Sequence, residues 1–286
     1  MTIIAGFKCK NGIVVCADTL ETSGPSKRQV PKLHFEETEI MPGEPIALAF
    51  CGAGYGPLID KLFDESWKSA QRAATIDDVC GEIESTIKVL YKEYGEIYQA
   101  GACPTAELIY GVKTKDGNTK LFSANGPIVT ERADYYSAGA GYYMADFLAS
   151  RMYEKNLTLR QCVILAAYVL FQAKEHVDGC GGGSHIAALR NDGTSGLIDS
   201  THVETLTNLV RDADVQVGRI LMKCADRQLS EKEFIESSTS TLKLLAFFRE
   251  LELKKLREHE EMWPTPGLDD TDDLGLPKLP NGKPEA

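Results

Sequence analysis

Apolar and polar positions alternate over short stretches on both sides of three polar turns. The turns are Lys10-Asn11-Gly12, Lys115-Asp116-Gly117 and Asn191-Asp192-Gly193. Asn-Gly and Asp-Gly dipeptides between such stretches favour the tight turns of β-hairpins. We therefore expect three hairpins, joining residues 2–8 to 13–18, 106–113 to 119–123, and 185–190 to 196–200, and a further buried strand over 46–51.

Apolar residues spaced three or four positions apart indicate helices in other parts of the chain. This spacing runs over residues 57–73, 75–98, 142–155 and 159–177, and Thr75 and Thr158 stand where side chains cap helix starts. A long charged helix is expected over 230–261, because Ser230 and Glu233 fit a capping box. Strands grouped in hairpins and helices grouped in pairs predict an α+β fold, with antiparallel sheets covered by helices.

Composition changes this picture mainly at the C-terminus. Residues 264–286 hold five of the twelve prolines and a cluster of aspartates, a composition that buries too little apolar surface to order itself. Together with the change of character beyond about residue 215, this predicts three parts. They are a folded core over 1–215, a helical extension over 216–263, and a disordered acidic, Pro-rich tail over 264–286.

Charge and cysteine usage exclude several classes of protein. The 286-residue chain has a formal net charge of −11, whereas binding to nucleic acid or to anionic lipid uses basic surfaces. The longest apolar run, 162–171, is too short to span a bilayer, and the first residues do not resemble a signal peptide. None of the eight cysteines falls in a CxxC pair or at a metal-ligand spacing from a histidine. We expect a cytoplasmic protein with free thiols, no metal or organic cofactor, and no nucleic-acid or membrane partner.

The second residue carries candidate chemistry. Met1 precedes the small residue Thr2, a situation in which the initiator methionine is commonly removed. Removal would give Thr2 a free α-amino group, whose unperturbed pKa is about 7.7–8.0, beside its own hydroxyl. A threonine hydroxyl activated by its own amine is an established type of nucleophile. Thr2 opens the first predicted strand and Asp18 closes the partner strand, so the hairpin returns Asp18 toward Thr2.

Several short segments between residues 2 and 209 form an ordered series. In chain order they are residues 2–6, Asn11-Gly12, Ala17-Asp18-Thr19, Thr22-Ser23-Gly24, Lys32-Leu33, Gly52, Gly139-Ala140-Gly141 and 178–183. In this order and spacing the chain resembles the proteasome β-type family of N-terminal nucleophile (Ntn) hydrolases, in particular its bacterial members. The resemblance implies a four-layer α/β/β/α sandwich, with two antiparallel sheets between helix layers and the C-terminal helix and tail added to it.

The resemblance also implies catalytic roles for five residues. Thr2 would be the nucleophile and, through its amine, the base, while Lys32 would place a positive charge beside the Thr2 hydroxyl and pair with Asp18. The backbone N–H of Gly52 would donate to the oxyanion, a contribution of typically ~3–4 kcal/mol, and Asp178 matches an aspartate of a later family motif. Taken singly, Asp18 also fits a turn residue at a strand end, and Lys32 an exposed charge.

Two positions depart from the family pattern. Ala140 and Gly181 stand where the family has serines that assist the N-terminal amine. Ser137 and Ser184 are the candidates for supplying these hydroxyls instead.

Other matched positions concern the substrate. Those that match the first substrate pocket are Glu21, Val30, His34, Phe50 and Gly54. In such a pocket Phe50 would reduce the depth, and Glu21 would favour a basic or polar side chain. Thr22, together with Gly52, would hold an extended peptide by backbone hydrogen bonds.

These residues predict a threonine-type peptidase that cleaves peptide bonds through an acyl-enzyme on Thr2 after removal of Met1. The resemblance implies a self-compartmentalised homo-oligomeric ring, a peptide or unfolded protein as substrate, and an ATP-dependent unfoldase as a candidate partner. Two alternatives are open: an Ntn amidase acting on a small molecule, and a catalytically silent, proteasome-like structural subunit. A shallow closed pocket favours the first alternative, and a retained Met1 favours the second.

Overall fold

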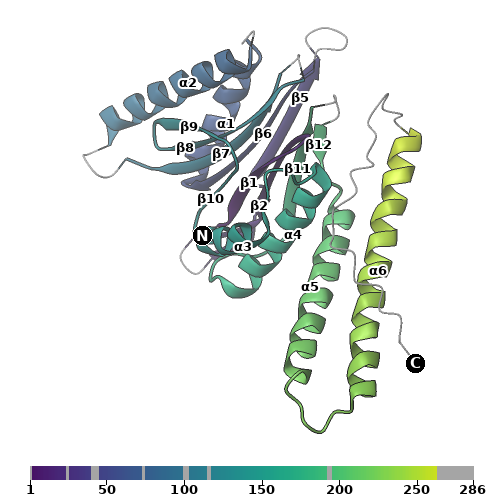
Figure 1. The fold of residues 1–286 in the computed structure, drawn as a ribbon. Helices are drawn as coiled ribbons and strands as arrows, with labels where there is room; N and C mark the ends of the chain where they lie inside the picture. Colours follow the sequence, from purple (N-terminus) through teal and green to yellow (C-terminus); the bar gives the residue numbers. More distant parts are fainter. Residues whose placement is uncertain are drawn as a thin grey trace. The chain divides into compact units, whose positions relative to one another are not determined.

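The computed structural model describes residues 2–23, 26–39, 45–72, 75–98, 103–114, 117–191 and 195–262 (Figure 1). Met1 and the predicted tail over 264–286 lie outside the described residues. The chain divides into two compact units, residues 1–241 and 242–286. The predicted parts 1–215 and 216–263 remain predictions.

Two five-stranded antiparallel sheets and a two-stranded ribbon contain the described strands. The first sheet has the order β10-β1-β2-β11-β12 and consists of β10 (Tyr135–Ala138), β1 (Ile4–Cys9), β2 (Gly12–Asp18), β11 (Ser184–Arg190) and β12 (Ser195–Leu197). The second has the order β5-β6-β7-β8-β9 and consists of β5 (Leu33–Glu39), β6 (Pro45–Gly54), β7 (Ala106–Lys113), β8 (Thr119–Asn125) and β9 (Ile128–Arg132). The ribbon pairs β3 (Leu20–Ser23) with β4 (Ser26–Gln29).

The three predicted hairpins are confirmed as the pairs β1–β2, β7–β8 and β11–β12. The predicted end of the third hairpin at residue 200 is wrong, because β12 stops at Leu197 and Asp199 already caps a helix. The strand expected over 46–51 lies within β6. β4 and β10 have four residues each. All four residues of β4 are polar and exposed, so it lacks the alternation that indicates a strand.

The helices predicted in two pairs are confirmed. They are α1 (Gly56–Ala70), α2 (Ile76–Ile97), α3 (Tyr142–Met152) and α4 (Leu159–His176), and the long charged helix is α6 (Glu231–Met262). Thr75 and Thr158 form capping boxes at α2 and α4. α5 (Ser200–Lys223) was not predicted, although its buried Val203, Leu206 and Val210 have helical spacing. Among the described helices, none has the length and apolar content needed to cross a membrane.

Alternating side chains of β6 divide the core of the first unit into two parts. Leu48 and Phe50 belong to a cluster with residues of α1 and α2, and Ala49 and Cys51 belong to a second cluster with Val15 and other residues of the first sheet. On the first sheet, α4 packs against β2 and β11, and α3 packs against β10 (Figure 1). The chain is therefore an α+β protein whose antiparallel sheets pack on each other and carry helices. The ends of β2 and β6, and the segment before β1, carry the candidate site.

Candidate active site

Thr2 lies two residues before the start of β1 and is 8% exposed. Its carbonyl oxygen accepts a hydrogen bond from the Gly141 N–H at 3.1 Å. Gly139 has a φ of +81°, and a Cβ at this position would lie 2.4 Å from the same carbonyl oxygen. Because this left-handed conformation and close approach both favour glycine, the turn over 139–141 packs its backbone against Thr2.

Asp18 ends β2 with a fully buried side chain. One carboxylate oxygen, Oδ1, accepts hydrogen bonds from the Ile3 N–H at 3.2 Å and from Lys32 Nζ at 2.8 Å. The other, Oδ2, accepts one from the Gly181 N–H at 2.9 Å. The β1–β2 register pairs Ile4 with Ala17, which brings Asp18 level with Ile3. Donors from three separate segments therefore fix both oxygens of the carboxylate.

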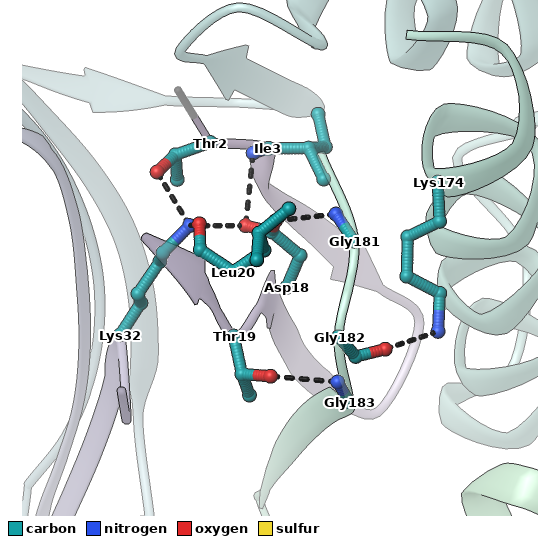
Figure 2. A network of polar contacts seen from close by, with 10 residues as sticks. All are labelled: Thr2, Ile3, Asp18, Thr19, Leu20, Lys32, Lys174, Gly181, Gly182 and Gly183. Carbon is teal, nitrogen blue, oxygen red and sulfur yellow. Dashed lines mark hydrogen bonds and ion pairs between the residues drawn. The ribbon is translucent and has the colours of Figure 1, made fainter. Parts of the chain in front are cut away.

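Lys32 connects this carboxylate to the Thr2 hydroxyl (Figure 2). Its Nζ donates to Thr2 Oγ1 at 2.6 Å, to Asp18 Oδ1 at 2.8 Å and to the carbonyl oxygen of Leu20. The residue is 7% exposed, so the interpretation of Lys32 as an exposed surface charge is wrong. A buried ammonium needs an opposite charge and hydrogen-bond acceptors, and these three neighbours supply them.

This geometry can activate an oxygen nucleophile. The Lys32 ammonium lies at hydrogen-bond distance from Thr2 Oγ1, where a positive charge favours the negative charge that forms as the hydroxyl loses its proton. Asp18 balances the charge of Lys32 and holds its position. The proton acceptor has to lie close to Oγ1, and an α-amino group on Thr2 itself meets that requirement.

A loop of three glycines, residues 181–183, contacts Asp18 and Thr19 at the end of β2 (Figure 2). Its first N–H donates to Asp18 Oδ2, and its third N–H donates to Thr19 Oγ1 at 2.6 Å. The middle residue, Gly182, has a φ of +71°, and a Cβ there would lie 2.5 Å from Thr19 Oγ1. Its carbonyl oxygen accepts a hydrogen bond from Lys174 Nζ at 3.2 Å. The loop can follow the end of β2 this closely because position 182 is glycine.

Three residues of this network were missed by sequence reasoning: Thr19, Glu107 and Lys174. Glu107 Oε2 accepts a hydrogen bond from the Gly139 N–H at 3.1 Å, so it holds the turn that contacts Thr2. Thr19 stood in the segment Ala17-Asp18-Thr19, but no role was predicted for it. Glu107 on β7 and Lys174 on α4 stand in no motif, so nothing in the sequence indicated either.

Gly52 and Asp178, the other two predicted catalytic residues, differ in their placement. β5 and β6 pair Leu33 with Cys51, so the register carries Gly52 to the level of Lys32. The proposed oxyanion contact of the Gly52 N–H remains a prediction. Asp178 is exposed in the turn after α4, and its side chain contributes none of the hydrogen bonds that join Thr2, Asp18 and Lys32.

Three of the predicted substrate-binding residues lie on or beside the β3–β4 ribbon. Glu21 accepts a hydrogen bond from Arg28 across the ribbon, and a Cβ at Gly56 would lie 3.4 Å from Glu21 Oε1. Thr22 is half-buried on β3. The Val30 N–H donates to the Thr19 carbonyl oxygen at 2.9 Å. The ribbon therefore starts from the catalytic candidates and reaches the first turn of α1.

The remaining predicted substrate residues lie on β5 and β6. The His34 ring stacks on Phe63 at 4.6 Å between centroids, and burial lowers the pKa of His34. Phe50 is fully buried and packs against Phe63 at 5.6 Å, so its ring belongs to the core beneath α1. Gly54 ends β6 with a φ of +130°.

The two serines considered as replacements have other partners. Ser137 Oγ donates to Asp146 Oδ1 at 2.6 Å and to the Tyr142 carbonyl oxygen. Ser184 Oγ accepts from Lys174 Nζ at 2.8 Å. Neither described contact is with Thr2, so these hydroxyls do not take the places of those absent at Ala140 and Gly181.

Other nucleophiles and metal ligands are less favourably placed. All eight cysteines are free thiols, and burial raises the pKa of Cys180 to about 11, which leaves it largely protonated near neutral pH. Within the part of the chain that the structure describes, no group of three or more His, Cys, Asp and Glu side chains is arranged to hold a metal ion.

The fold is similar to solved structures of Anbu, the ancestral β-subunit. Anbu from Yersinia bercovieri matches with a TM-score of 0.63 and 14% identity, over 76% of this chain and 97% of that chain. An Anbu (Gly-1) mutant from Hyphomicrobium sp. strain MC1 matches with a TM-score of 0.59 and 15% identity, over 77% of this chain and 97% of that chain. The helical assembly of the Anbu complex from Pseudomonas aeruginosa matches with a TM-score of 0.61 and 13% identity, over 77% of this chain and 96% of that chain. No family model and no curated protein matches the chain.

These comparisons correct the predicted family. The assignment to the proteasome β-type family is wrong, because the chain shares its fold with Anbu structures, and Anbu is a distinct though proteasome-related family. The glycine turns and the Thr2, Asp18 and Lys32 positions suggested that assignment, since short motifs of this kind accompany the fold. At 13–15% identity, the likeness to the Anbu structures establishes the fold alone.

Proposed function

We propose that this protein is an amide-bond hydrolase that uses Thr2 as its nucleophile and that its substrate is a peptide. The observation that carries the proposal is the buried bridge of Lys32, whose Nζ lies 2.6 Å from Thr2 Oγ1 and 2.8 Å from Asp18 Oδ1. A buried ion pair is a poor device for stability alone, since apolar residues of the same size serve as well or better. Its placement against a hydroxyl at the N-terminus favours a catalytic use.

The proposed reaction starts once Met1 has been removed. The Thr2 amine takes the hydroxyl proton, and Oγ1 forms a bond to the carbonyl carbon of the substrate. Collapse of the tetrahedral intermediate breaks the C–N bond, the leaving amine receives that proton, and an ester remains on Thr2. Water then adds to the ester carbonyl and gives its proton back to Oγ1, which releases the acid and restores the enzyme. Lys32 stabilises Oγ1 in both halves, and the Gly52 N–H is the proposed donor to the oxyanion.

The peptide preference rests on the strands around Thr2. β3 follows directly from the site, and its Thr22 is half-buried rather than covered, so an extended peptide can add beside it through backbone hydrogen bonds. Glu21 on the same strand would then favour a basic side chain in the substrate. Asp178, Val30, His34, Phe50 and Gly54 remain proposed members of the site and its pocket.

The arrangement of the first unit supports a four-layer α/β/β/α sandwich. One core cluster joins α1 and α2 to the second sheet, and another joins the two sheets. We also propose that the protein forms a homo-oligomer. One Anbu structure is a helical assembly, and Tyr142, Tyr143 and Phe147 on α3 of this chain are about half exposed, as is common for residues buried by association. An unfoldase partner belongs to the same proposal.

A second candidate function is a catalytically silent subunit of such an assembly. The observation that favours it is the engagement of Ser137 with Asp146 and of Ser184 with Lys174. In these contacts neither Ser137 nor Ser184 replaces the hydroxyls missing at Ala140 and Gly181. A silent subunit has no need for Met1 removal, which separates the two candidates.

Intact-mass analysis of the purified full chain tests both candidates. The sample is measured before and after treatment with an epoxyketone electrophile that traps an N-terminal threonine. We expect a mass lacking Met1 and a single adduct, absent in Thr2→Ala and retained in Thr239→Ala, which changes an exposed threonine of α6. Quantitative retention of Met1 would overturn the hydrolase proposal and support the silent subunit. If the adduct forms, a short amide and a longer peptide of the same sequence then distinguish an amidase from a peptidase.

A further inference from the structure

A hollow of about 400 Å³ lies on the other side of the glycine loop from Asp18, between β11, α4 and α5. Figure 2 shows Lys174 on this side, with the loop between it and the Thr2–Asp18–Lys32 group. The lining includes Lys174, Ser184, Glu204, Asn208 and Arg211. This volume is within the range of small-molecule sites, which is about 300–1,000 Å³.

Lys174 brings a cation to the wall of the hollow, and its described hydrogen bonds go to neutral acceptors. Its Nζ donates to the Gly182 carbonyl oxygen at 3.2 Å and to Ser184 Oγ at 2.8 Å, both neutral acceptors. Among the described residues, no carboxylate lies within ion-pair distance of it. Burial lowers the pKa of Lys174, while the charge of Asp18 opposes this effect. A partly buried ammonium without a nearby anion is stabilised by any anion that can reach it.

Arg211 supplies a second cation from α5. Its guanidinium lies 5.3 Å from the centre of the Phe171 ring, and its Nη1 donates to Asn208 Oδ1 at 3.0 Å. The Glu175 carboxylate is exposed and lies 3.9 Å from Arg211 Nη2, so it neutralises the guanidinium only weakly. Stacking and the Asn208 contact hold the planar fork in place, which lowers the entropy lost when it binds a carboxylate or phosphate.

We infer that this hollow is a binding site for a small anion bearing a carboxylate or phosphate group, held between Lys174 and Arg211. Ser184 and Asn208 add neutral polar groups to the same wall. Glu204 also lines the hollow, and its negative charge disfavours large polyanions such as nucleic acid.

The site connects to the Thr2 region through one residue. Lys174 contacts the carbonyl of Gly182, and the N–H groups on either side of that glycine hold Asp18 and Thr19. An anion that draws the ammonium toward the hollow changes the support of the loop. An effect of the anion on the reactivity of Thr2 rests on the proposed function, whereas binding and its effect on the loop do not.

Calorimetric titration of the full chain at low ionic strength with succinate and, separately, with inorganic phosphate tests the inference. The two titrations distinguish a carboxylate from a phosphate site. We expect saturable binding with one site per chain for at least one of them. Since a charge-assisted hydrogen bond contributes enough to change affinity about tenfold, Arg211→Ala and Lys174→Met should each weaken binding by about that factor. The matched control is Arg219→Ala, which removes an exposed arginine of α5 outside the hollow.

Amide hydrogen exchange of the peptide containing residues 181–183 provides a readout that needs no activity. At an anion concentration that half-saturates the wild type, the anion should change the exchange rate in the wild type and in Thr2→Ala, and should change it much less in Arg211→Ala. Arg211→Ala keeps the Lys174 contacts, so it serves as the test variant if Lys174→Met fails to fold. The inference is overturned if neither ion binds saturably, or if Arg211→Ala binds like Arg219→Ala. A protein that binds the anion but forms no Thr2 adduct refutes the proposed function alone.

Discussion

Replacing Lys32 with methionine tests the buried bridge at the centre of the site. Methionine has a similar length and fills the same space, but it removes the partner of a carboxylate that is fully buried. Removing one member of a buried ion pair typically costs about 3–5 kcal/mol. The N–H groups of Ile3 and Gly181 still donate to Asp18 in the variant, so we expect a loss near the lower limit, about 3 kcal/mol in the free energy of unfolding.

Urea unfolding followed by circular dichroism measures this change. The double variant Asp18→Asn/Lys32→Met completes a double-mutant cycle. In the Asp18→Asn background no carboxylate charge is left to strand, so Lys32→Met should cost clearly less there than in the wild type. Lys61→Met is the matched control, because it breaks the exposed pair of Lys61 with Glu65 at 2.9 Å, and exposed pairs of this kind contribute little. The midpoint of unfolding in this control should stay within the error of the measurement.

Two results would refute the reasoning. One is a Lys32→Met protein that unfolds with the stability of the wild type, because Asp18 then needs no buried counter-ion. The other is a Lys32→Met change that costs as much in the Asp18→Asn background as in the wild type, which would attribute the loss to packing. Both Lys32 variants should also lose the electrophile adduct on Thr2, and normal labelling in either would remove Lys32 from the proposed mechanism.

Three further changes give different signatures in the same unfolding assay. Gly182→Ala should destabilise the protein by about 1–2 kcal/mol, since position 182 is left-handed and a Cβ meets Thr19 Oγ1, whereas Gly196→Ala, with open space around it, should leave stability almost unchanged. Tyr110→Phe should raise stability by up to about 1 kcal/mol, because it removes a buried hydroxyl that has no hydrogen-bond partner among the described residues. The pKa of His34 is lowered by burial, so the unfolded chain binds the proton more readily and stability should fall as the pH drops through about 6.5. His34→Gln should reduce that slope, and an unchanged slope would contradict it.

Much of the fold follows from local patterns because the physical causes are local. A polar turn between alternating segments favours a hairpin through its own backbone geometry, which is why β1–β2 and β7–β8 were predictable. Thr75 and Thr158 cap helices through contacts three residues away. β5 was not predictable in the same way. It carries Glu36 and Glu37 and is a strand because it pairs with β6, and such pairing depends on the rest of the fold.

The residues of the candidate site also differ in whether local contacts or the rest of the fold place them. Thr2 and Asp18 meet through a hairpin, so their proximity was predictable from the sequence. Lys32 was placed there only through a resemblance, because nothing local to it distinguishes a buried lysine from an exposed one. Asp178 illustrates the opposite outcome. It matched a motif, yet the structure leaves its side chain exposed, and the backbone of the following turn, through Gly181, contacts Asp18 instead.

Lys174 belongs to the support of the candidate site but stands in none of the motifs that suggested a family. The short motifs around Thr2 indicated the proteasome β-type family, whereas the similar solved structures are Anbu proteins. The hydrogen bonds of Lys32 with Thr2 and Asp18 are nevertheless those that the motifs implied. The Gly181 N–H donates to Asp18, and Lys174 on α4 donates to the carbonyl oxygen of Gly182 in the same loop. Glycine N–H groups hold a carboxylate but carry no exchangeable hydroxyl proton for a water or an amine. If Thr2 is the nucleophile, its proton path therefore runs through its own amine and solvent, and the support behind Asp18 determines position rather than proton transfer.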